Sequence, residues 1–449
     1  MRQFKLFFLI TFLSLLSSCA CGFKFTKIKE PIYATKSDFI GKIKTIKPTE
    51  INNTGKIYLY KNFIFVHEKN NGIHIIDNID IKNPKNIGFL RIPMSGDIAI
   101  KDNILYADMF KDLIAIDIND ITNSKFLRKN DNVFEISNGN NEEKIQIGYR
   151  VKETIYEPVV CGTGNSNSFI LLPMQPPNEP ITPSSSSPNQ GNTYGKTGIG
   201  GSLARFSIIE DYLYVLSSID MIIYNLKNTQ DFQKENTIKI GNGLETIFPY
   251  DDKLFLGSQT GMYVYDNKNK IKPEFLSTFQ HIKSCDPVVV ENKKAYVTLR
   301  SGSSCRGGNN ELDIIDLEDI KNPKLIKTYP MKNPSGLAIK DNILYLCDGS
   351  EGLKIFDVSK SDDIKFIKAI AINNPKDIIL NENNHAIIVA EEGLLQYDFS
   401  DLKQDNVQLS KITTKNVDKN IEIGNNNNND SKKVGDIFYY NWYEKYFLE

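Results

Sequence analysis

Residues 336–357 read GLAIKDNILYLCDGSEGLKIFD, and this stretch decides the fold. It contains an apolar segment, a Lys-Asp-Asn turn, a second apolar segment, a polar loop and a third segment that ends in Asp. β-branched and aromatic residues between clusters of Asn, Asp and Gly are typical of β-strands. A fourth short strand follows the third one in each unit, as at residues 324–329. The stretch therefore predicts a unit of four antiparallel strands.

The same unit recurs seven times along the chain. Its second strand carries an aromatic or apolar anchor at Phe65, Tyr106, Tyr214, Phe255, Tyr296, Tyr345 and Ile387. The steps between anchors are 41, 108, 41, 41, 49 and 42 residues, which is a period of 41 with insertions of 67, 8 and 1. A repeated four-stranded unit of ~40–45 residues is the signature of a propeller blade. We therefore expect an all-β fold, a seven-bladed β-propeller of four-stranded blades.

Length and charge limit the function. The chain has 449 residues, which would suggest about three domains at ~150 residues each, but the repeat replaces them with one ring. Lys and Arg number 54 against 55 Asp and Glu, so the net charge is −1. Without a basic excess the chain cannot gain affinity for phosphates through counterion release, so we expect no nucleic-acid partner.

Four segments follow from these patterns. We expect a signal peptide at residues 1–18, a tether at 19–36, the propeller at 37–413, and an Asn-rich linker with an aromatic tail at 414–449. An insertion spans residues 130–200. Apolar and polar residues alternate in stretches between residues 133 and 160, which indicates a strand or hairpin there. Its second half is rich in Pro, Ser and Gly and is expected to be disordered. The tail segment FYYNWYEKYF, residues 438–447, is either a docking strand or a partner-binding tag.

Ring closure usually needs a strand from the far terminus. Residues 37–48, SDFIGKIKTIKP, resemble the fourth strand of the first unit, NIGFLRIP at residues 86–93. No candidates for the first three strands of a blade precede these residues in the sequence. We therefore expect residues 37–48 to complete the last blade as its outer strand. The competing candidate for this position is Val407–Thr413.

The N-terminus resembles a secretory signal. Arg2 and Lys5 precede the uncharged run LFFLITFLSLL at residues 6–16, whose 11 residues are too few for a membrane span of ~20. This run leads into Leu-Ser-Ser-Cys, which resembles a bacterial lipobox and implies lipidation of Cys19. An ordinary cleaved signal with an incidental Cys is the alternative. With Ala20 after the Cys, the resemblance implies the bacterial outer membrane, with periplasmic face or cell surface left open.

The third strand of the repeat carries a family resemblance. Leu353-Lys354-Ile355-Phe356-Asp357 and Ile73-His74-Ile75-Ile76-Asp77 resemble the repeat of LVIVD proteins, which are secreted or surface bacterial β-propellers. Asn225 and Gln396 depart from the pattern. The resemblance covers roughly residues 40–413, and CDPVVVENKKAYVTLR at residues 285–300 looks like a lipoprotein branch of Bacteroidota-type bacteria. It implies architecture and location but no reaction.

Acidic residues end six of the seven third strands, at Asp77, Asp117, Asp266, Asp316, Asp357 and Asp398, with Asn225 in the seventh. A functional interpretation is a ring of carboxylates. The structural one is favoured, because Asp and Asn accept hydrogen bonds from nearby backbone amides in tight turns, and the repeat needs that turn seven times.

Four cysteines map to one face of the predicted ring. Export to an oxidising compartment permits disulfides, and we expect a Cys285–Cys305 pair that staples an enlarged loop. Pairing of Cys161 with Cys347 remains open. A metal site is not expected, because there is no CxxC spacing and the four histidines are scattered.

Charged residues recur where the first strand of each unit begins. They are Lys56, Asp97, Arg205, Glu245, Asp286 and Asp377, with His281, Arg300 and Arg306 on adjoining loops. The ring should bring them around the mouth of its channel, where converging polar groups form a site for a polar ligand or ion. The alternative is a solvated rim with weak ion pairs.

Three functions remain open. The first is a membrane-tethered binding or interaction scaffold, the second a metal-assisted hydrolase or lactonase using Glu245, Asp286 or Asp377, and the third an envelope assembly factor. Motifs of common hydrolases and nucleotide-binding proteins are missing, so no catalytic residue and no cofactor is assigned. Expected partners are the membrane, through an N-terminal lipid, and a protein or glycan; the chain is expected to be a monomer.

Overall fold

A computed structural model describes residues 23–52, 54–68, 71–134, 144–158, 197–280, 287–301, 309–403 and 407–414. These residues form two compact units. The first, which we call the arm, comprises residues 23–42 and 144–158. The second comprises residues 43–134 and 197–414, and it holds all seven repeats.

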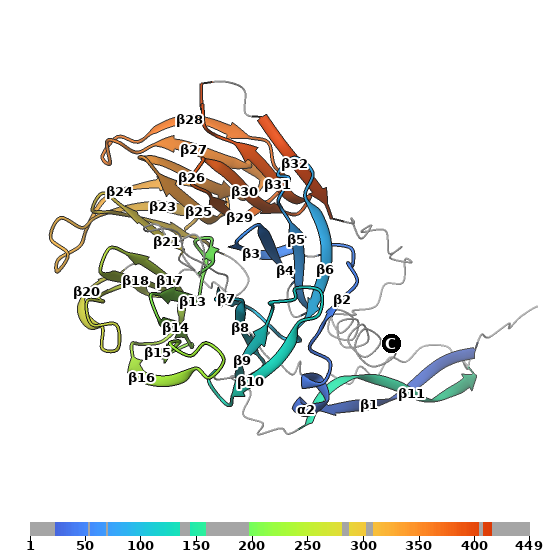
Figure 1. Ribbon diagram of the computed structural model, residues 1–449. Helices are drawn as coiled ribbons and strands as arrows, with labels where there is room; N and C mark the ends of the chain where they lie inside the picture. Colours follow the sequence, from blue (N-terminus) through green and yellow to red (C-terminus); the bar gives the residue numbers. More distant parts are fainter. Residues whose placement is uncertain are drawn as a thin grey trace, which may run out of the picture. The chain divides into compact units, whose positions relative to one another are not determined.

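The second unit is a ring of seven antiparallel sheets (Figure 1). The predicted seven-bladed β-propeller is therefore confirmed. Blade 1 holds β3 (Thr54–Tyr60), β4 (Phe63–Glu68), β5 (Gly72–Asp77) and β6 (Lys85–Arg91), and blade 2 holds β7 (Ile98–Lys101), β8 (Ile104–Met109), β9 (Asp112–Asp117) and β10 (Lys125–Asn130). Blade 3 holds β13 (Phe206–Ile209), β14 (Tyr212–Leu216), β15 (Asp220–Asn225) and β16 (Gln233–Lys239).

Blades 4 to 7 repeat this order. Blade 4 holds β17 (Leu244–Tyr250), β18 (Lys253–Ser258), β19 (Gly261–Asp266) and β20 (Glu274–Gln280), and blade 5 holds β21 (Val288–Glu291), β22 (Lys294–Leu299), β23 (Glu311–Asp316) and β24 (Lys324–Pro330). Blade 6 holds β25 (Pro334–Lys340), β26 (Ile343–Asp348), β27 (Leu353–Asp357) and β28 (Lys365–Ile370), with a 3-10 turn, η1 (Gly349–Glu351). Blade 7 holds β29 (Pro375–Leu380), β30 (His385–Ala390), β31 (Gly393–Asp398) and β32 (Val407–Thr413).

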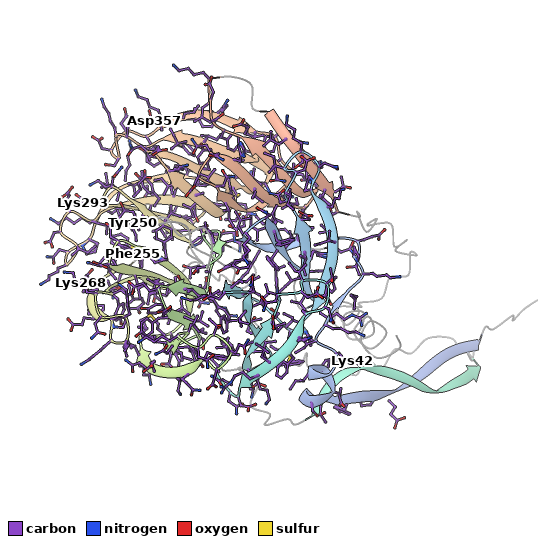
Figure 2. The ribbon with its side chains drawn as sticks, in the orientation of Figure 1. Lys42, Tyr250, Phe255, Lys268, Lys293 and Asp357 are labelled. Atoms are coloured by element: carbon purple, nitrogen blue, oxygen red, sulfur yellow. The ribbon has the colours of Figure 1, made fainter. Side chains whose placement is uncertain are left out.

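The core lies between neighbouring blades. All seven anchors of the second strands are at most 3% exposed, and Phe255 is seen within blade 4 in Figure 2. One apolar cluster joins blades 4, 5 and 6 through residues such as Phe255, Tyr296 and Leu344. Burying a large apolar side chain contributes about 1.5–3 kcal/mol, so the repeat anchors hold adjacent blades face to face.

The residue that ends each third strand makes a turn. In all seven blades its side-chain oxygen accepts a hydrogen bond from the backbone N–H two residues later, at 2.8–3.0 Å. In blade 6, for example, Asp357 accepts from the N–H of Ser359 at 2.9 Å. The structural interpretation of these acids is confirmed.

Side chains join most neighbouring blades at the turns between first and second strands. In blade 1, Tyr60 Oη donates to Asn103 in blade 2 at 2.9 Å, and in blade 5, Glu291 accepts from the backbone N–H of Asn342 in blade 6 at 2.8 Å. The closing seam between blades 7 and 1 uses other contacts. There Lys376 Nζ donates to the carbonyl of Thr54 at 2.6 Å, beside an apolar cluster from both blades.

The prediction for the closing strand was wrong. Blade 7 is completed by β32, the competing candidate, which pairs with β31. Within residues 37–48, only β2 (Thr45–Ile46) is a strand, and it pairs with the outer strand β6 of blade 1. Thr35 caps α2 (Lys36–Ile40) and forms a capping box with Asp38, so the start of the segment is helical. The ring therefore closes without exchanging a strand between its terminal blades.

The arm is a two-stranded antiparallel ribbon. In it, β1 (Phe23–Thr35) pairs with β11 (Lys144–Pro158) from Phe23↔Pro158 to Thr35↔Lys144. The strand expected within residues 133–160 is thus β11, and residues 23–35, which belong to the expected tether at 19–36, form its partner strand β1. The alternating sequence of these residues favours strand pairing over coil. Among the described residues, no helix has the length and hydropathy needed to cross a membrane.

Candidate functional site

The ring brings four of the charged residues expected at the channel mouth together. Lys56, Asp97, Arg205 and Asp377 occupy the beginnings of the first strands of blades 1, 2, 3 and 7, and each is at most 8% exposed. They are therefore buried inside the ring and do not form a solvated rim. The sequence pattern placed them at equivalent positions but could not show their burial.

Asp97 lies at the centre of this group. Its Oδ2 atom is 3.2 Å from Lys56 Nζ and accepts a hydrogen bond from the backbone N–H of Arg205 at 2.6 Å. The Arg205 guanidinium forms an ion pair with Asp108, at the top of the second strand of blade 2. Asp108 also accepts hydrogen bonds from the backbone N–H groups of Gly96 (2.6 Å) and Asp97 (2.8 Å). These contacts link blades 1, 2 and 3.

The end of the long insertion occupies the channel beside these charges. We call residues 197–206 the channel segment. Within it, β12 (Ile199–Gly200) pairs with β3 of blade 1, and the Gly198 N–H donates to the carbonyl of Ile100 in blade 2 at 2.9 Å. Ser202 Oγ then accepts from the backbone N–H of Leu337 in blade 6 at 2.8 Å. The segment thus spans from blades 1 and 2 to blade 6 before it enters blade 3.

Close approach explains the glycines of this segment. A Cβ atom on Gly198 would lie 2.3 Å from the ring of Tyr58, and one on Gly201 would lie 2.6 Å from both carboxylate oxygens of Asp377. The Gly-rich end of residues 130–200 was expected to be disordered, and for residues 197–200 this was wrong. The sequence signal was the run GIGG, which permits backbone packing against neighbouring strands. Residues 159–196 lie outside the described part of the chain.

Burial dominates the ionisation of the group. It raises the pKa of Asp377 well above its ordinary value and raises that of Asp97 against the attraction of Lys56 and Arg205. Burial also lowers the pKa of Lys56 to about 8 and that of His67, which faces Lys56, to about 4. Low polarity favours the neutral form of each group.

Several buried polar atoms of the group make no hydrogen bond among the described residues. They are Lys56 Nζ, His67 Nε2, Arg205 Nε and Asp377 Oδ2. Three carboxylates (Asp97, Asp108 and Asp377) lie beside two cations (Lys56 and Arg205). The fully ionised group would therefore carry one excess negative charge, and the raised pKa values of Asp377 and Asp97 reduce this excess. The arrangement fixes the channel segment and the first strands of four blades in one network.

Glu245 and Arg300 lie apart from this network, on blades 4 and 5. Glu245 accepts a hydrogen bond from Gln259 Nε2 at 3.0 Å. Burial lowers the pKa of Arg300, and the charge of Glu245 opposes this effect. Among the described residues, no three His, Cys, Asp or Glu side chains are grouped to hold a metal ion.

The remaining candidates lie in other parts of the chain. His281, Asp286 and Arg306, the expected Cys285–Cys305 pair, Cys161 and the lipidation site Cys19 all lie outside the described residues, as does the aromatic tail. Cys347 is a free, buried thiol next to the network, and burial together with Asp377 raises its pKa.

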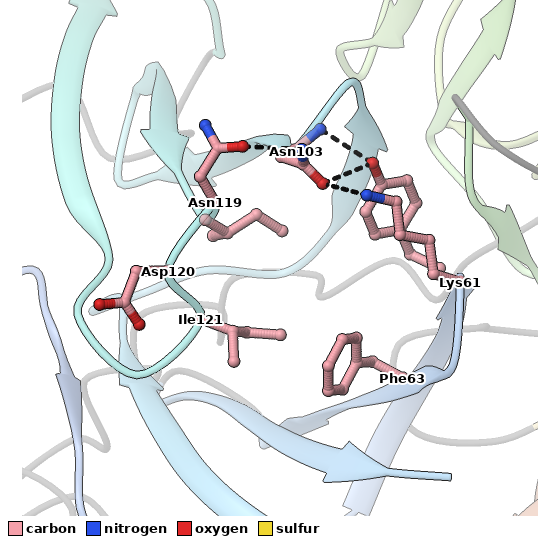
Figure 3. A pocket seen from close by; sticks show the side chains of 8 residues that line it. Lys61, Phe63, Asn103, Asn119, Asp120 and Ile121 are labelled. Atoms are coloured by element: carbon pink, nitrogen blue, oxygen red, sulfur yellow. Dashed lines mark hydrogen bonds between the residues drawn. The ribbon is translucent and has the colours of Figure 1, made fainter. Parts of the chain in front are cut away.

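A shallow pocket of about 380 Å³ lies on the opposite face of the ring, where first strands turn into second strands (Figure 3). Phe63, Ile118 and Ile121 supply its apolar lining. Its polar groups bind one another: Asn103 accepts from Lys61 Nζ at 2.6 Å and donates to Asn119 at 2.8 Å. The sequence alone does not distinguish this pocket, because its residues belong to turns that recur in every blade.

Comparison with known proteins supports the fold alone. No family model and no curated protein matches the chain. A protein of Lactobacillus plantarum is 11% identical in sequence, covers 80% of this chain and 96% of its own, and has a TM-score of 0.51. The computationally designed protein Ika8 (8% identity, 83% and 92% coverage) has a TM-score of 0.47. PorZ, described as a surface component of the type-IX secretion system of Porphyromonas gingivalis, has a TM-score of 0.46 at 12% identity, with 83% and 39% coverage.

Proposed function

We propose that the chain is an outer-membrane lipoprotein, related to the LVIVD-repeat propellers, whose ring is a scaffold that holds a protein or glycan partner. The N-terminal sequence supports the lipoprotein part of this proposal, and one observation of the fold supports the scaffold. The two long insertions, of 67 and 8 residues, both lie at one end of the strands. The first separates a fourth strand (β10) from the next first strand (β13), and the second separates a second strand from a third (β22 and β23). In antiparallel blades these connections share a face, which we call the insertion face.

The other face of the ring is nearly uniform. There the first and second strands meet in two-residue turns in blades 1 to 6, and the seven Asx turns follow the third strands. Variable loops on a rigid framework are where binding function concentrates. The insertion face is therefore the binding surface of the scaffold, with its enlarged loops as the contacting elements.

The filled channel supports a scaffold with loop contacts. The channel segment and the Lys56–Asp97 and Arg205–Asp108 pairs occupy the centre of the ring. A ligand entering there would have to displace a paired strand and break buried ion pairs. A partner held by the loops leaves this network intact.

Pull-down of the native lipidated protein after crosslinking tests the scaffold. We expect a defined envelope partner that is lost when residues 302–308 are replaced by a short Gly-Ser linker. The matched control shortens the β29–β30 turn, residues 381–384, on the other face, and should retain the partner. Equal loss in both variants would contradict the proposal. Stoichiometric divalent metal in the same sample would instead favour the hydrolase, with Asp286 as its first candidate.

Lipidation is tested separately through Cys19. The mature wild-type protein should carry acyl groups by mass spectrometry and fractionate with outer membranes. The variant Cys19→Ser should lose both the added mass and the membrane association through the anchor. An unmodified wild-type N-terminus at an ordinary cleavage site would overturn the lipoprotein assignment.

A further inference from the structure

The channel segment covers a buried carboxyl group. Asp377, at the beginning of the first strand of blade 7, is 0% exposed. A Cβ atom on Gly201 of the channel segment would lie 2.6 Å from both of its carboxylate oxygens, and a Cβ on Gly336 of blade 6 would lie 2.5 Å from Oδ1. The carboxyl group is therefore enclosed between the channel segment and β25, and water reaches it from the channel only when the channel segment moves away.

The ionised form of this carboxyl group is poorly compensated. Its Oδ1 atom accepts a hydrogen bond from the backbone N–H of Ile378 at 3.0 Å, and its Oδ2 atom makes no hydrogen bond among the described residues. Burial raises the pKa of Asp377 well above its ordinary value, although the N–H groups of Ile378 and Ser202 and the charge of Lys56 lower it. A buried charge without its own counter-ion is costly, so the neutral acid suits this position.

The surrounding cations have other partners. The titratable groups of this region are Lys56 and His67 on blade 1, Asp97 and Asp108 on blade 2, Arg205 in the channel segment, Cys347 and Asp348 on blade 6, and Lys376 on blade 7. Lys56 lies 3.2 Å from Asp97, and Arg205 pairs with Asp108. Lys376 donates to the carbonyl of Thr54 at 2.6 Å. An ionised Asp377 would therefore share Lys56 with Asp97, whose own negative charge repels it.

The other contacts of the channel segment are few. Thr197 forms an isolated bridge with Lys101, Gly198 donates to the carbonyl of Ile100, and β12 pairs with β3 over two residues. All seven blades have four paired strands without the channel segment. Segments with few contacts open locally at a lower free energy than the global unfolding of the protein. The channel segment can therefore detach while the ring remains folded.

We propose that the channel segment is a pH-sensitive strap, which closes the channel while Asp377 is protonated and is released when Asp377 ionises. Detachment returns the carboxyl group to solvent, where its ordinary pKa of 3.8 favours the anion. Because the closed state has the higher pKa, it is favoured at acid pH and becomes less stable as pH rises above 3.8. Release would make Lys56, Asp97 and Arg205 accessible to a polar ligand from the channel, independently of the lipid anchor and of any partner at the loops.

Hydrogen exchange of the full chain between about pH 5 and about pH 7 tests this strap. The window lies between the pKa values of His67 (about 4) and Lys56 (about 8), so both largely keep their charge. After correction for intrinsic exchange, the opening constant of amides 198–205 should increase up to about tenfold per pH unit. In Asp377→Asn, which stays neutral, the opening constant should be lower at pH 7 and should not change with pH.

Two variants and one reference strand are the controls. Asp398→Asn alters a carboxylate of the same blade that accepts from the N–H of Ser400 on the other face of the ring, and it should retain the native pH dependence. Ser202→Ala removes the hydrogen bond from the N–H of Leu337, so it should increase opening at every pH without changing the slope. The amides of β19 in blade 4 report global unfolding in the same samples.

Three outcomes would overturn the inference. An opening constant of the native chain that does not depend on pH would exclude a pH-sensitive strap. An equal pH dependence in Asp377→Asn would exclude Asp377 as the sensing group. Exchange of amides 198–205 that is as slow as that of β19 at every pH would show that the channel segment opens only when the ring unfolds.

Discussion

Two glycines, Gly201 and Gly336, lie close to Asp377. Replacing either glycine by alanine should destabilise the ring, and the reason differs between the two. Gly201 belongs to the channel segment and Gly336 to β25 of blade 6. A Cβ atom on Gly201 would have the carboxylate atoms of Asp377 as its three nearest neighbours, at 2.6–2.8 Å. A Cβ on Gly336 would also lie 2.8 Å from the backbone Cα of Asp377 and the carbonyl oxygen of Lys376.

These distances set the expected magnitude. Cβ contacts below 3.0 Å essentially do not occur, so each substitution forces a shift of several tenths of an ångström. Overpacking of this kind costs about 1–3 kcal/mol. Gly336→Ala should lie near the upper end, because backbone of blade 7 must move. Gly201→Ala should cost less, because a side chain can rotate.

Combination with Asp377→Ala separates the two causes. Removing the carboxylate removes all three close contacts of Gly201→Ala, so the double variant should recover about 1 kcal/mol relative to additivity. Gly336→Ala should show little recovery, since its backbone contacts remain. The free energy of unfolding from urea titration at neutral pH measures each value.

Gly41→Ala is the control, because a Cβ at Gly41 meets no atom within 4 Å. It should change stability by less than about 0.5 kcal/mol. If Gly201→Ala is as destabilising with Asp377→Ala as without it, the channel segment does not pack against this carboxylate. Neutral behaviour of both glycine variants would refute the packing of the channel.

Three further predictions concern buried or repeated polar groups. Because burial lowers the pKa of His67 to about 4, the fold loses about 3 kcal/mol of stability as pH falls from 6.5 toward 4. His67→Gln should reduce the slope of the free energy of unfolding against pH in this range. An unchanged slope would contradict the prediction. The raised pKa of Asp377 means that the fold loses stability as pH rises above 3.8. The free energy of unfolding of Asp377→Asn should therefore increase relative to that of the native protein as pH rises in the same titration. An increase of this difference toward acid pH would contradict the prediction. Asp357→Ala should cost about 1 kcal/mol in urea unfolding by removing the hydrogen bond to Ser359, whereas Asp357→Asn should retain it; equal losses would argue against the turn.

Periodicity made the ring predictable. The 41-residue spacing from Phe65 to Ile387 reflects a local requirement, since each blade must bury an anchor and make the same turn. The Asx turns follow equally from local chemistry. These features need only residues close in sequence, so the sequence alone identified them.

The closure and the site depended on contacts between distant residues. Thr35 and Asp38 form a capping box that removes the start of residues 37–48 from strand pairing, and this T-x-x-D signal was available in the sequence. Asp108 was not recognised, because its partner Arg205 is 97 residues away. Gly198 and Gly200 fell within the insertion at residues 130–200 whose second half was expected to be disordered, because composition does not show which channel a short Gly-rich run enters.

The channel segment has a consequence for how this ring can evolve. It makes specific contacts with blades 1, 2 and 6, reaches Asp377 in blade 7 and continues into blade 3. Duplication or deletion of one whole repeat would change the diameter of the central opening. Here a ring of six would leave no room for these ten residues, and a ring of eight would separate Ser202 from Leu337. The contacts of this segment therefore match the diameter of a ring of seven blades.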